Sequence, residues 1–499
     1  MHAREGRLLL LLLVAYGWLF VFFERINNPN EMVRVYAARA LVEQRSWSIG
    51  RRVATGGRFA DDLRGWGYVN DKALVCDDPA QRPPACAGRL YAAKAPGASL
   101  LGAPVLAVLR AFGPLRKTPA VFALRWVLVI LPSVIFWLAL RRYLLDAGVS
   151  EDTALVCTLA GALGSLSLTY GQMFAGHQMA ALALGAAFLS GFWACRPGWV
   201  GFFAALAVAI EYPSAPAAAL LVAGFLVHRR RGLRGVVLGA LPWIAVVAQF
   251  QWSAFTAPWS TPYGHVENPE FVKDMAPGFM GISMPTAERI TGSLFAPWLG
   301  LFYWAPWTAL ALRPARRHLP QLTAFAIVVY YLLFQFTNAL WRSGWVIGPR
   351  YITPLVPFAA ISIAFSLRNR WSLTIFSGLA AAAIAATGLA SSVCQGFPLE
   401  VQNPLREVVW PLLSHGYVPR NPLQALGVPG VWSALPYFAA LGIAIALALR
   451  AAPHRFVAAI VAIAMTIAQW AGQASDDRAA ARFLASQWEP DPPPGAQRF

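Results

Sequence analysis

Long apolar runs, separated by short polar connections, follow one another along almost the whole chain. A helix that crosses a bilayer needs about 20 predominantly apolar residues. Runs near that length predict spans at approximately 8–23, 120–140, 153–170, 174–194, 197–212, 213–228, 233–252, 293–312, 321–339, 349–366, 372–390, 432–450 and 455–472. The pattern therefore predicts an all-α fold, a polytopic transmembrane helical bundle of about 13 spans.

A further apolar stretch at 98–112 is short for a full crossing. Lys and Arg accumulate in cytoplasmic loops, so clusters such as Arg141-Arg142 and Arg229-Arg230-Arg231 should be cytoplasmic. We expect the N-terminus on the same side. With that orientation the stretch 98–112 must stay on one side, as a juxtamembrane or re-entrant helix. The alternative is that 98–112 crosses and one pair of segments within 153–228 forms a single span.

This topology gives one multi-span membrane domain at 1–472, with an extracytoplasmic tail at 473–499. Long loops at about 24–97, 253–292 and 391–431 then share the extracytoplasmic side, so we expect the protein to work at that face. The first loop opens with a helical pattern at 31–41. Its apolar positions suit an amphipathic helix on the membrane surface, with Asn30 as its N-cap.

Composition supports a membrane protein and argues against several functions. Of the 499 residues 58% are hydrophobic and 13% are charged, with a mean hydropathy of +0.51, whereas soluble domains carry about 25% charged residues. The net charge of +18 fits basic cytoplasmic loops, and we expect no nucleic-acid partner. No phosphate-binding loop or nucleotide fingerprint supports ATP-driven transport. Cys76 and Cys86 flank a polar stretch in the first loop, where a disulfide is permitted but not required.

Candidate chemistry lies mainly in the predicted outer loops. Glu31 follows the first span and has the position of a general base, or simply of an acid that complements a helix dipole. Lys94 fits a phosphate ligand or an interfacial lysine whose amine reaches water. His177 lies at an outer turn, where it fits either a phosphate or sugar contact or an interfacial histidine with a backbone partner.

Two other places carry charge close to the bilayer. Glu211 is an acid beside two apolar segments, and such groups are costly in a membrane; proton relay, substrate contact and structural pairing are all open for it. Arg342 and Arg350 lie in a turn at 341–351 that is rich in Gly and Trp. Arginines on the outer face run against the positive-inside bias, and phosphate binding or contact with lipid phosphates explains them.

Three short motifs, in this order, resemble those of the GT-C class of membrane glycosyltransferases, and most closely the dolichyl-phosphate-mannose protein mannosyltransferase and aminoarabinose transferase group. Asn30-Glu31 stands where that group has an Asp-Glu pair, so the first acid is missing here. Lys94-Ala95-Pro96 stands for a Lys-Pro-Pro motif, and Gly348-Pro349-Arg350-Tyr351 for a late Gly-Pro-Arg-Tyr turn.

The resemblance implies a transferase that moves a sugar from a polyprenyl-phosphate carrier to a lipid, glycan or protein acceptor on the extracytoplasmic side of a bacterial inner membrane. Glu31 would be catalytic and would need no cofactor, although a divalent metal is left open. By resemblance, Lys94 and Arg350 would hold the carrier phosphate. Further candidates for substrate or carrier-phosphate binding are Arg34, Tyr91, His177, Arg342 and Tyr351, and further candidate acids are Glu24, Asp61, Asp62 and Glu211. The alternatives are a non-catalytic transporter or flippase and an envelope assembly protein.

Overall fold

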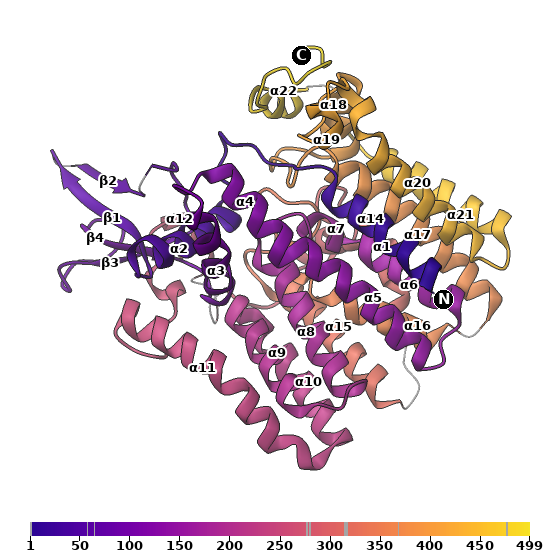
Figure 1. Ribbon diagram of the computed structural model, residues 1–499, viewed down its shortest axis with the longest axis horizontal. Coiled ribbons are helices and arrows are strands. Elements are labelled where there is room, and N and C mark those ends of the chain that lie inside the picture. The colour runs from indigo at the N-terminus through magenta and orange to yellow at the C-terminus, as the bar shows by residue number, and fades with distance from the viewer. Residues whose placement is uncertain are drawn as a thin grey trace.

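The computed structural model describes residues 2–499 apart from 57, 64, 276, 277, 279, 280, 314–317, 368, 476 and 477. Helices form the body of the molecule (Figure 1). In its first half they are α1 (His2–Gly17), α2 (Pro29–Gln44), α3 (Gly97–Ala111), α4 (Lys117–Arg125), α5 (Leu131–Asp146), α6 (Glu151–Leu163), α7 (Leu166–Tyr170), α8 (Gly176–Phe192), α9 (Pro197–Ile210), α10 (Ala215–His228) and α11 (Leu233–Phe255). They continue as α12 (Pro269–Met275), α13 (Ala287–Phe295), α14 (Leu301–Trp304), α15 (Leu319–Thr337), α16 (Leu355–Ser366), α17 (Arg370–Ser391), α18 (Trp410–Ser414), α19 (Pro422–Ala425), α20 (Leu435–Arg450), α21 (Arg455–Trp470) and α22 (Ala479–Ser486).

Several continuous helices are long and apolar enough to cross a membrane, and the chain is an integral membrane protein. They cover Lys117–Asp146, Arg230–Phe255, Leu319–Thr337, Arg370–Ser391 and Gly430–Arg450, and shorter apolar helices stand beside them. The number of crossings stays a prediction. One predicted span is wrong as a single helix, because the run 293–312 is divided among α13, α14 and a 3-10 turn at Pro306–Leu312. Prolines at 297 and 306 explain the interruptions, since proline cannot continue a helix.

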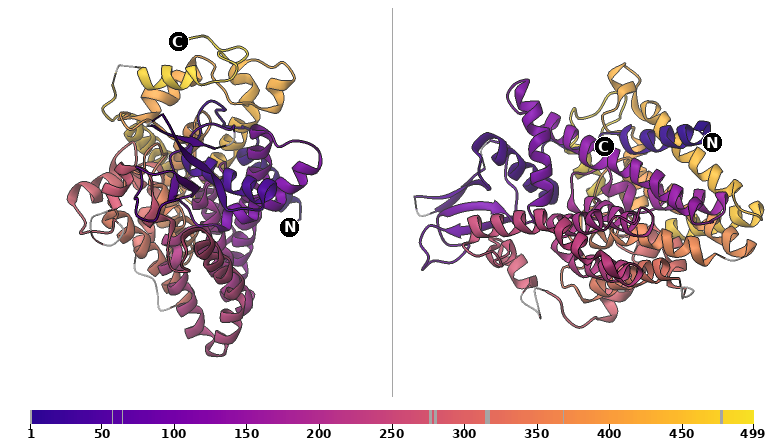
Figure 2. Two further views of the ribbon diagram at one scale, coloured as in Figure 1. Left: turned by 90° about the vertical axis from the view of Figure 1, so that its left-hand side faces the viewer. Right: turned by 60° about the horizontal axis from the view of Figure 1, so that its bottom comes forward.

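The all-α prediction is wrong for the first loop, which contains an antiparallel sheet. Its strands are β1 (Ser48–Thr55), β2 (Arg58–Asp62), β3 (Lys72–Cys76) and β4 (Gly88–Ala92), in the order β2-β1-β4-β3. A disulfide joins Cys76 to Cys86, between the end of β3 and the chain that leads into β4. The sheet stands at one end of the helical body in Figure 1 and in the right-hand view of Figure 2.

Helix α2 does not lie exposed on a surface as the sequence predicted. Nearly every residue of its first three turns is buried, polar ones included, and α2 packs along α3. Its N-cap is Asn28 rather than Asn30, because the Asn28 side chain accepts hydrogen bonds from the N–H groups of Asn30 and Glu31. Buried polar groups on this helix are therefore held in place by neighbouring elements.

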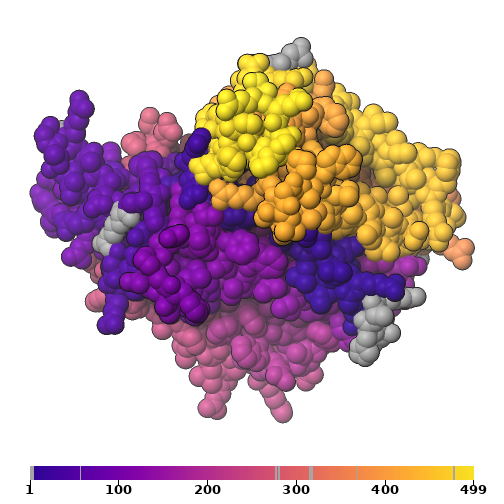
Figure 3. Space-filling view, turned by 45° about the horizontal axis from the view of Figure 1, so that its top comes forward, coloured from indigo at the N-terminus to yellow at the C-terminus, as the bar shows by residue number. Residues whose placement is uncertain are grey.

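The C-terminal tail folds back on the loop that follows α17. Trp488, just beyond α22, is buried against Tyr417 with their rings 5.3 Å apart. Figure 3 shows the tail lying against the segment before α20 on the face that it presents. The tail thus forms part of the folded protein.

A candidate active-site cavity

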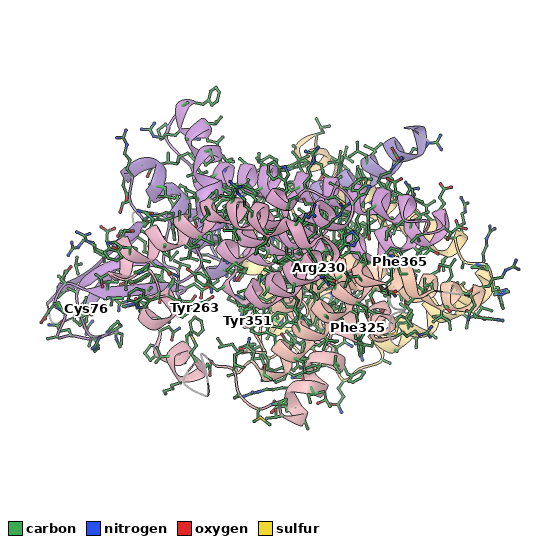
Figure 4. The ribbon with its side chains drawn as sticks, turned by 90° about the horizontal axis from the view of Figure 1, so that it is seen from below. Cys76, Arg230, Tyr263, Phe325, Tyr351 and Phe365 are labelled. Carbon is green, nitrogen blue, oxygen red and sulfur yellow. A yellow bond between two sulfur atoms is a disulfide. The ribbon has the colours of Figure 1, made fainter. Side chains whose placement is uncertain are left out.

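Residues that lie far apart in the sequence line one cavity of about 1300 Å³. The first loop contributes Asn30, Glu31, Asp71 and Lys94, and later segments contribute His177, Glu211, Thr261, Tyr263, Glu270, Arg342, Arg350, Tyr351, Gln395 and Leu484. Figure 4 places Tyr263 between Cys76, in the sheet, and Tyr351, nearer the centre of the molecule. The three predicted long loops and the C-terminal tail therefore meet at one place.

These residues meet because consecutive helices run in alternating directions, so that the end of one helix lies beside the start of the next. The cavity lies at the start of α8, the end of α9, the start of α10 and the end of α15. Helix α9 stops at Ile210, three residues before Pro213, and Glu211 takes an extended conformation with φ −144°. Gly97 brings α3 against this end of α9, since a Cβ there would stand 2.7 Å from the carbonyl oxygen of Ala209. Lys94, just before α3, is thereby set near the end of α9.

The Glu31 carboxylate accepts hydrogen bonds from a neighbouring arginine and from a backbone N–H. Arg125 donates from Nε to Oε1 over 2.7 Å and from a terminal nitrogen to Oε2 over 2.6 Å. The N–H of Phe174 donates to Oε1 over 2.7 Å. Both side chains of the ion pair are almost completely buried, at 0% and 2% exposure. Glu31 is among the residues that line the cavity, but its carboxylate is fully buried and both oxygens are engaged within the protein.

A second carboxylate, Glu211, belongs to a more open network. Arg34 donates to Glu211 Oε1 over 2.6 Å and, from its other terminal nitrogen, to Asn30 Oδ1 over 2.6 Å. His177 bridges the same two residues, with Nδ1 3.6 Å from Glu211 Oε1 and Nε2 3.4 Å from Asn30 Nδ2. Because Asn30 Oδ1 accepts from Arg34, its amide nitrogen donates to Nε2, which assigns the imidazole proton to Nδ1.

Positive charge lies on the neighbouring wall. Lys94 Nζ is 3.2 Å from Asp71 Oδ2, and its side chain is 15% exposed. Arg350 follows Gly348, whose φ of +67° turns the chain into the cavity. Its guanidinium lies over the ring of Tyr351, and its Nε is buried without a hydrogen-bond partner. Arg350 forms no close ion pair with the residues that the structure describes; the Asp71 carboxylate, which pairs with Lys94, acts on it electrostatically from farther away.

Other residues from the sequence prediction take varied positions. Tyr351 packs edge-on against His177 with ring centroids 5.7 Å apart, and Arg342 stacks on Trp298 at 4.5 Å; both line the cavity. Tyr91, a residue of β4, does not line it, because its ring is buried against that of Phe255. The prediction that Tyr91 contacts substrate is not favoured by this position.

Three of the additional candidate acids lie outside the cavity lining. Glu24 is 3.8 Å from Arg420, and Asp62 is an exposed residue of β2 opposite Arg51. Asp61 belongs to a buried cluster with Arg52, Lys72 and Glu267. We call these four residues the sheet cluster.

Charge in the sheet cluster is balanced. Burial alone would raise the pKa of Asp61, but hydrogen bonds from Arg52 and Lys72 lower it overall. Burial raises the pKa of Glu267 above its ordinary value, against the opposing charges of the two cations. Two cations and two carboxylates leave no net charge, which indicates a structural role.

Two ion-pair partners of cavity-lining residues were missed in the sequence. Arg125 lies within the predicted span 120–140, and an arginine inside an apolar run was a visible signal. Asp71, the partner of Lys94, had no local signal, because it is brought there only by the turn before β3. Among the residues that the structure describes, no group of three or more His, Cys, Asp or Glu side chains is placed to hold a metal ion.

Comparison with known proteins found structural likeness only. No family model matches the chain, and no curated protein sequence matches it. Solved structures with some similarity include ArnT from Cupriavidus metallidurans in the apo state, with 14% identity, a TM-score of 0.45, and coverage of 94% of this chain and 77% of that one. The same protein bound to undecaprenyl phosphate gives 16% identity, a TM-score of 0.43, and 94% and 76% coverage.

An apo oligosaccharyltransferase from Archaeoglobus fulgidus gives 12% identity, a TM-score of 0.37, and coverage of 100% of this chain and 61% of that one. Likeness at this level does not show which reaction the chain carries out.

Proposed function

We propose that the protein is a membrane glycosyltransferase that moves a sugar from a polyprenyl-phosphate carrier to an acceptor hydroxyl in the cavity. The observation that carries the proposal is Arg350, a guanidinium at the cavity wall whose Nε is buried without a hydrogen-bond partner and which has no carboxylate at ion-pair distance among the described residues. An unpaired charge out of water is costly, and a phosphate bound at this place would neutralise it. Guanidinium groups suit phosphate through paired, charge-assisted hydrogen bonds.

Lys94 supplies a second positive charge for the same phosphate. Its ammonium and the Arg350 guanidinium both act electrostatically on His177, so they surround the same part of the cavity. Among the described residues, Lys94 forms an ion pair with one carboxylate, that of Asp71. These two residues are also those that the motif resemblance implies, and the carrier phosphate, which is the leaving group, would gain charge between them as the sugar departs.

Apolar side chains provide a place for the isoprenoid part of the carrier. Between α10 and α15 the cavity is lined by Pro213, Pro216, Leu333, Phe334 and Leu340. A chain of isoprene units is entirely hydrocarbon and gains free energy when it leaves water for such a surface. Phosphate-binding charge beside an apolar wall suits a lipid phosphate better than a free nucleotide sugar.

The test is carrier binding and sugar release by the purified protein in nanodiscs. We expect labelled undecaprenyl phosphate to bind, and one member of a panel of polyprenyl-phosphate sugars to release free polyprenyl phosphate when acceptors are supplied. Arg350→Gln should weaken binding about 100-fold, as expected when one partner of a charge pair is lost. Arg406→Gln is the matched control, because Arg406 is exposed, lies outside the cavity lining and, among the described residues, donates from its side chain to the Gly472 carbonyl.

Failure of the wild-type protein to bind undecaprenyl phosphate would contradict the proposal. Binding without turnover of any donor would replace the transferase by a carrier-binding transporter or flippase.

A further inference from the structure

We propose that Glu211, and not Glu31, receives the proton of the acceptor hydroxyl, and that Glu31 is a positioning residue. This inference rests on the proposed transferase function and assigns its central catalytic residue. The sequence singled out Glu31 because it follows the first span. The geometry of the two carboxylates points instead to Glu211.

A general base needs a free oxygen within hydrogen-bond reach of the hydroxyl. Glu31 offers no such oxygen to the cavity, because its side chain is 0% exposed, Arg125 donates to both oxygens, and the Phe174 N–H donates to Oε1 as well. Protonation of Glu31 would also leave Arg125 buried beside a neutral acid, which is unfavourable in a region of low dielectric. The arrangement fixes α2 to α4 and to the turn before α8.

Glu211 has the opposite arrangement. Oε1 receives the hydrogen bond from Arg34, whereas Oε2 takes part in no hydrogen bond that the structure describes. The side chain is 12% exposed and lines the cavity. Arg34 therefore anchors one oxygen, and the other remains able to accept a hydrogen bond from a bound hydroxyl.

The neighbours of Glu211 hold it firmly. Gly176 leaves just enough room, since a Cβ there would stand 2.1 Å from Oε1. His177 Nδ1, which carries the ring proton, faces Oε1 at 3.6 Å. Asn30 Oδ1 and Glu211 Oε1 are bound by the same guanidinium. Glu211 thus stands beside Asn30, the position at which the resembling group has the first acid of its Asp-Glu pair. It supplies a carboxylate there from the end of α9.

In the proposed transfer, one bond forms as one bond breaks, and the proton passes to a named group. The acceptor hydroxyl oxygen forms a bond to the anomeric carbon of the donor sugar, and the bond from that carbon to the phosphate oxygen breaks. The bonding electron pair leaves with the polyprenyl phosphate, which Lys94 and Arg350 hold. The hydroxyl proton moves to Glu211 Oε2 and later passes to water.

The experiment compares Glu211→Gln, Glu31→Gln and the control Glu400→Gln in nanodiscs, with the donor that the wild-type protein turns over. Glu400 is exposed and lies outside the cavity lining. We expect Glu211→Gln to lower kcat at least about 100-fold, to retain binding of undecaprenyl phosphate, and to lose the acid limb of the pH–rate profile. Glu31→Gln should instead lower the unfolding temperature.

A structural role for Glu211 would not remove the acid limb while carrier binding persists, so that combination supports the inference. If Glu211→Gln keeps turnover while stably folded Glu31→Gln loses it, the inference is overturned and the base is Glu31. The proposed transferase function stands whether the base is Glu211 or Glu31. If the wild-type protein turns over no donor, the proposed function fails, and this inference fails with it.

Discussion

The sheet cluster and the cavity wall both keep charged side chains away from water, but they pair them differently. In the sheet cluster, Arg52 and Lys72 each meet both carboxylates. At the cavity wall, Arg350 has no ion partner within the described chain, and Glu211 keeps one oxygen open. Pairing satisfied within the protein indicates a structural role, whereas unsatisfied charge beside a cavity indicates a ligand.

Glu31 shows that the difference does not follow from location alone. It contributes to the cavity wall, yet with Arg125 it is as completely paired as the sheet cluster. Structural and ligand-binding residues therefore differ in whether their side chains keep hydrogen-bonding atoms without a protein partner. The following predictions test that distinction, from the largest expected effect to the smallest.

Glu31→Gln should lower the free energy of unfolding by about 4 kcal/mol, because it leaves the Arg125 charge buried without a partner. Thermal unfolding in detergent micelles measures the effect. The double variant Glu31→Gln/Arg125→Met should recover most of the loss, since both charges are then removed. A single variant as stable as the wild-type protein would show that the pair is not structural.

Lys72→Met and Arg350→Met should have opposite effects on stability. Loss of Lys72 leaves carboxylates of the sheet cluster in excess and should cost about 3 kcal/mol. Loss of Arg350 removes a charge without a partner, so the protein should unfold at the same or a higher temperature while carrier binding is lost. Equal destabilisation by both variants would remove the distinction between the two regions.

Cys76→Ser should cost about 2 kcal/mol, because the disulfide closes a short loop in the unfolded chain. The bond links residues separated by 10 positions. Carrier affinity should stay unchanged, since neither cysteine lines the cavity. Thermal unfolding with and without a reductant measures the effect in the wild-type protein, and the Cys76→Ser variant should not respond to the reductant.

Acid should affect the sheet cluster in two steps of opposite sign. Glu267 has a raised pKa, so its contribution to stability is complete below its ordinary value of 4.5 and is lost as the pH rises through the folded value. Asp61 has a lowered pKa, so its contribution is present above 3.8 and is lost as the pH falls through the folded value. Unfolding temperatures of the wild-type protein and Asp61→Asn should converge in acid, and a pH-independent difference would contradict this.

Much of the helical body could be predicted from the sequence. The spans 174–194, 321–339 and 372–390 correspond closely to α8, α15 and α17. These segments are long and uniformly apolar, and only a helix satisfies its own backbone within a bilayer. The sheet was missed because its strands are short and mix polar with apolar residues, and their pairing depends on contacts between separate parts of the loop.

By itself, the sequence determined a helical membrane protein with a concentration of acidic and basic residues in its loops, because hydropathy acts locally along the chain. It also supplied Lys94, Arg350, Glu31 and Glu211 as candidates. Only the tertiary structure decided which charges are neutralised. The distance from Arg125 to Glu31, and from Arg34 to Glu211, depends on the packing of helices far apart in the sequence, and electrostatic energy depends on that distance and on burial.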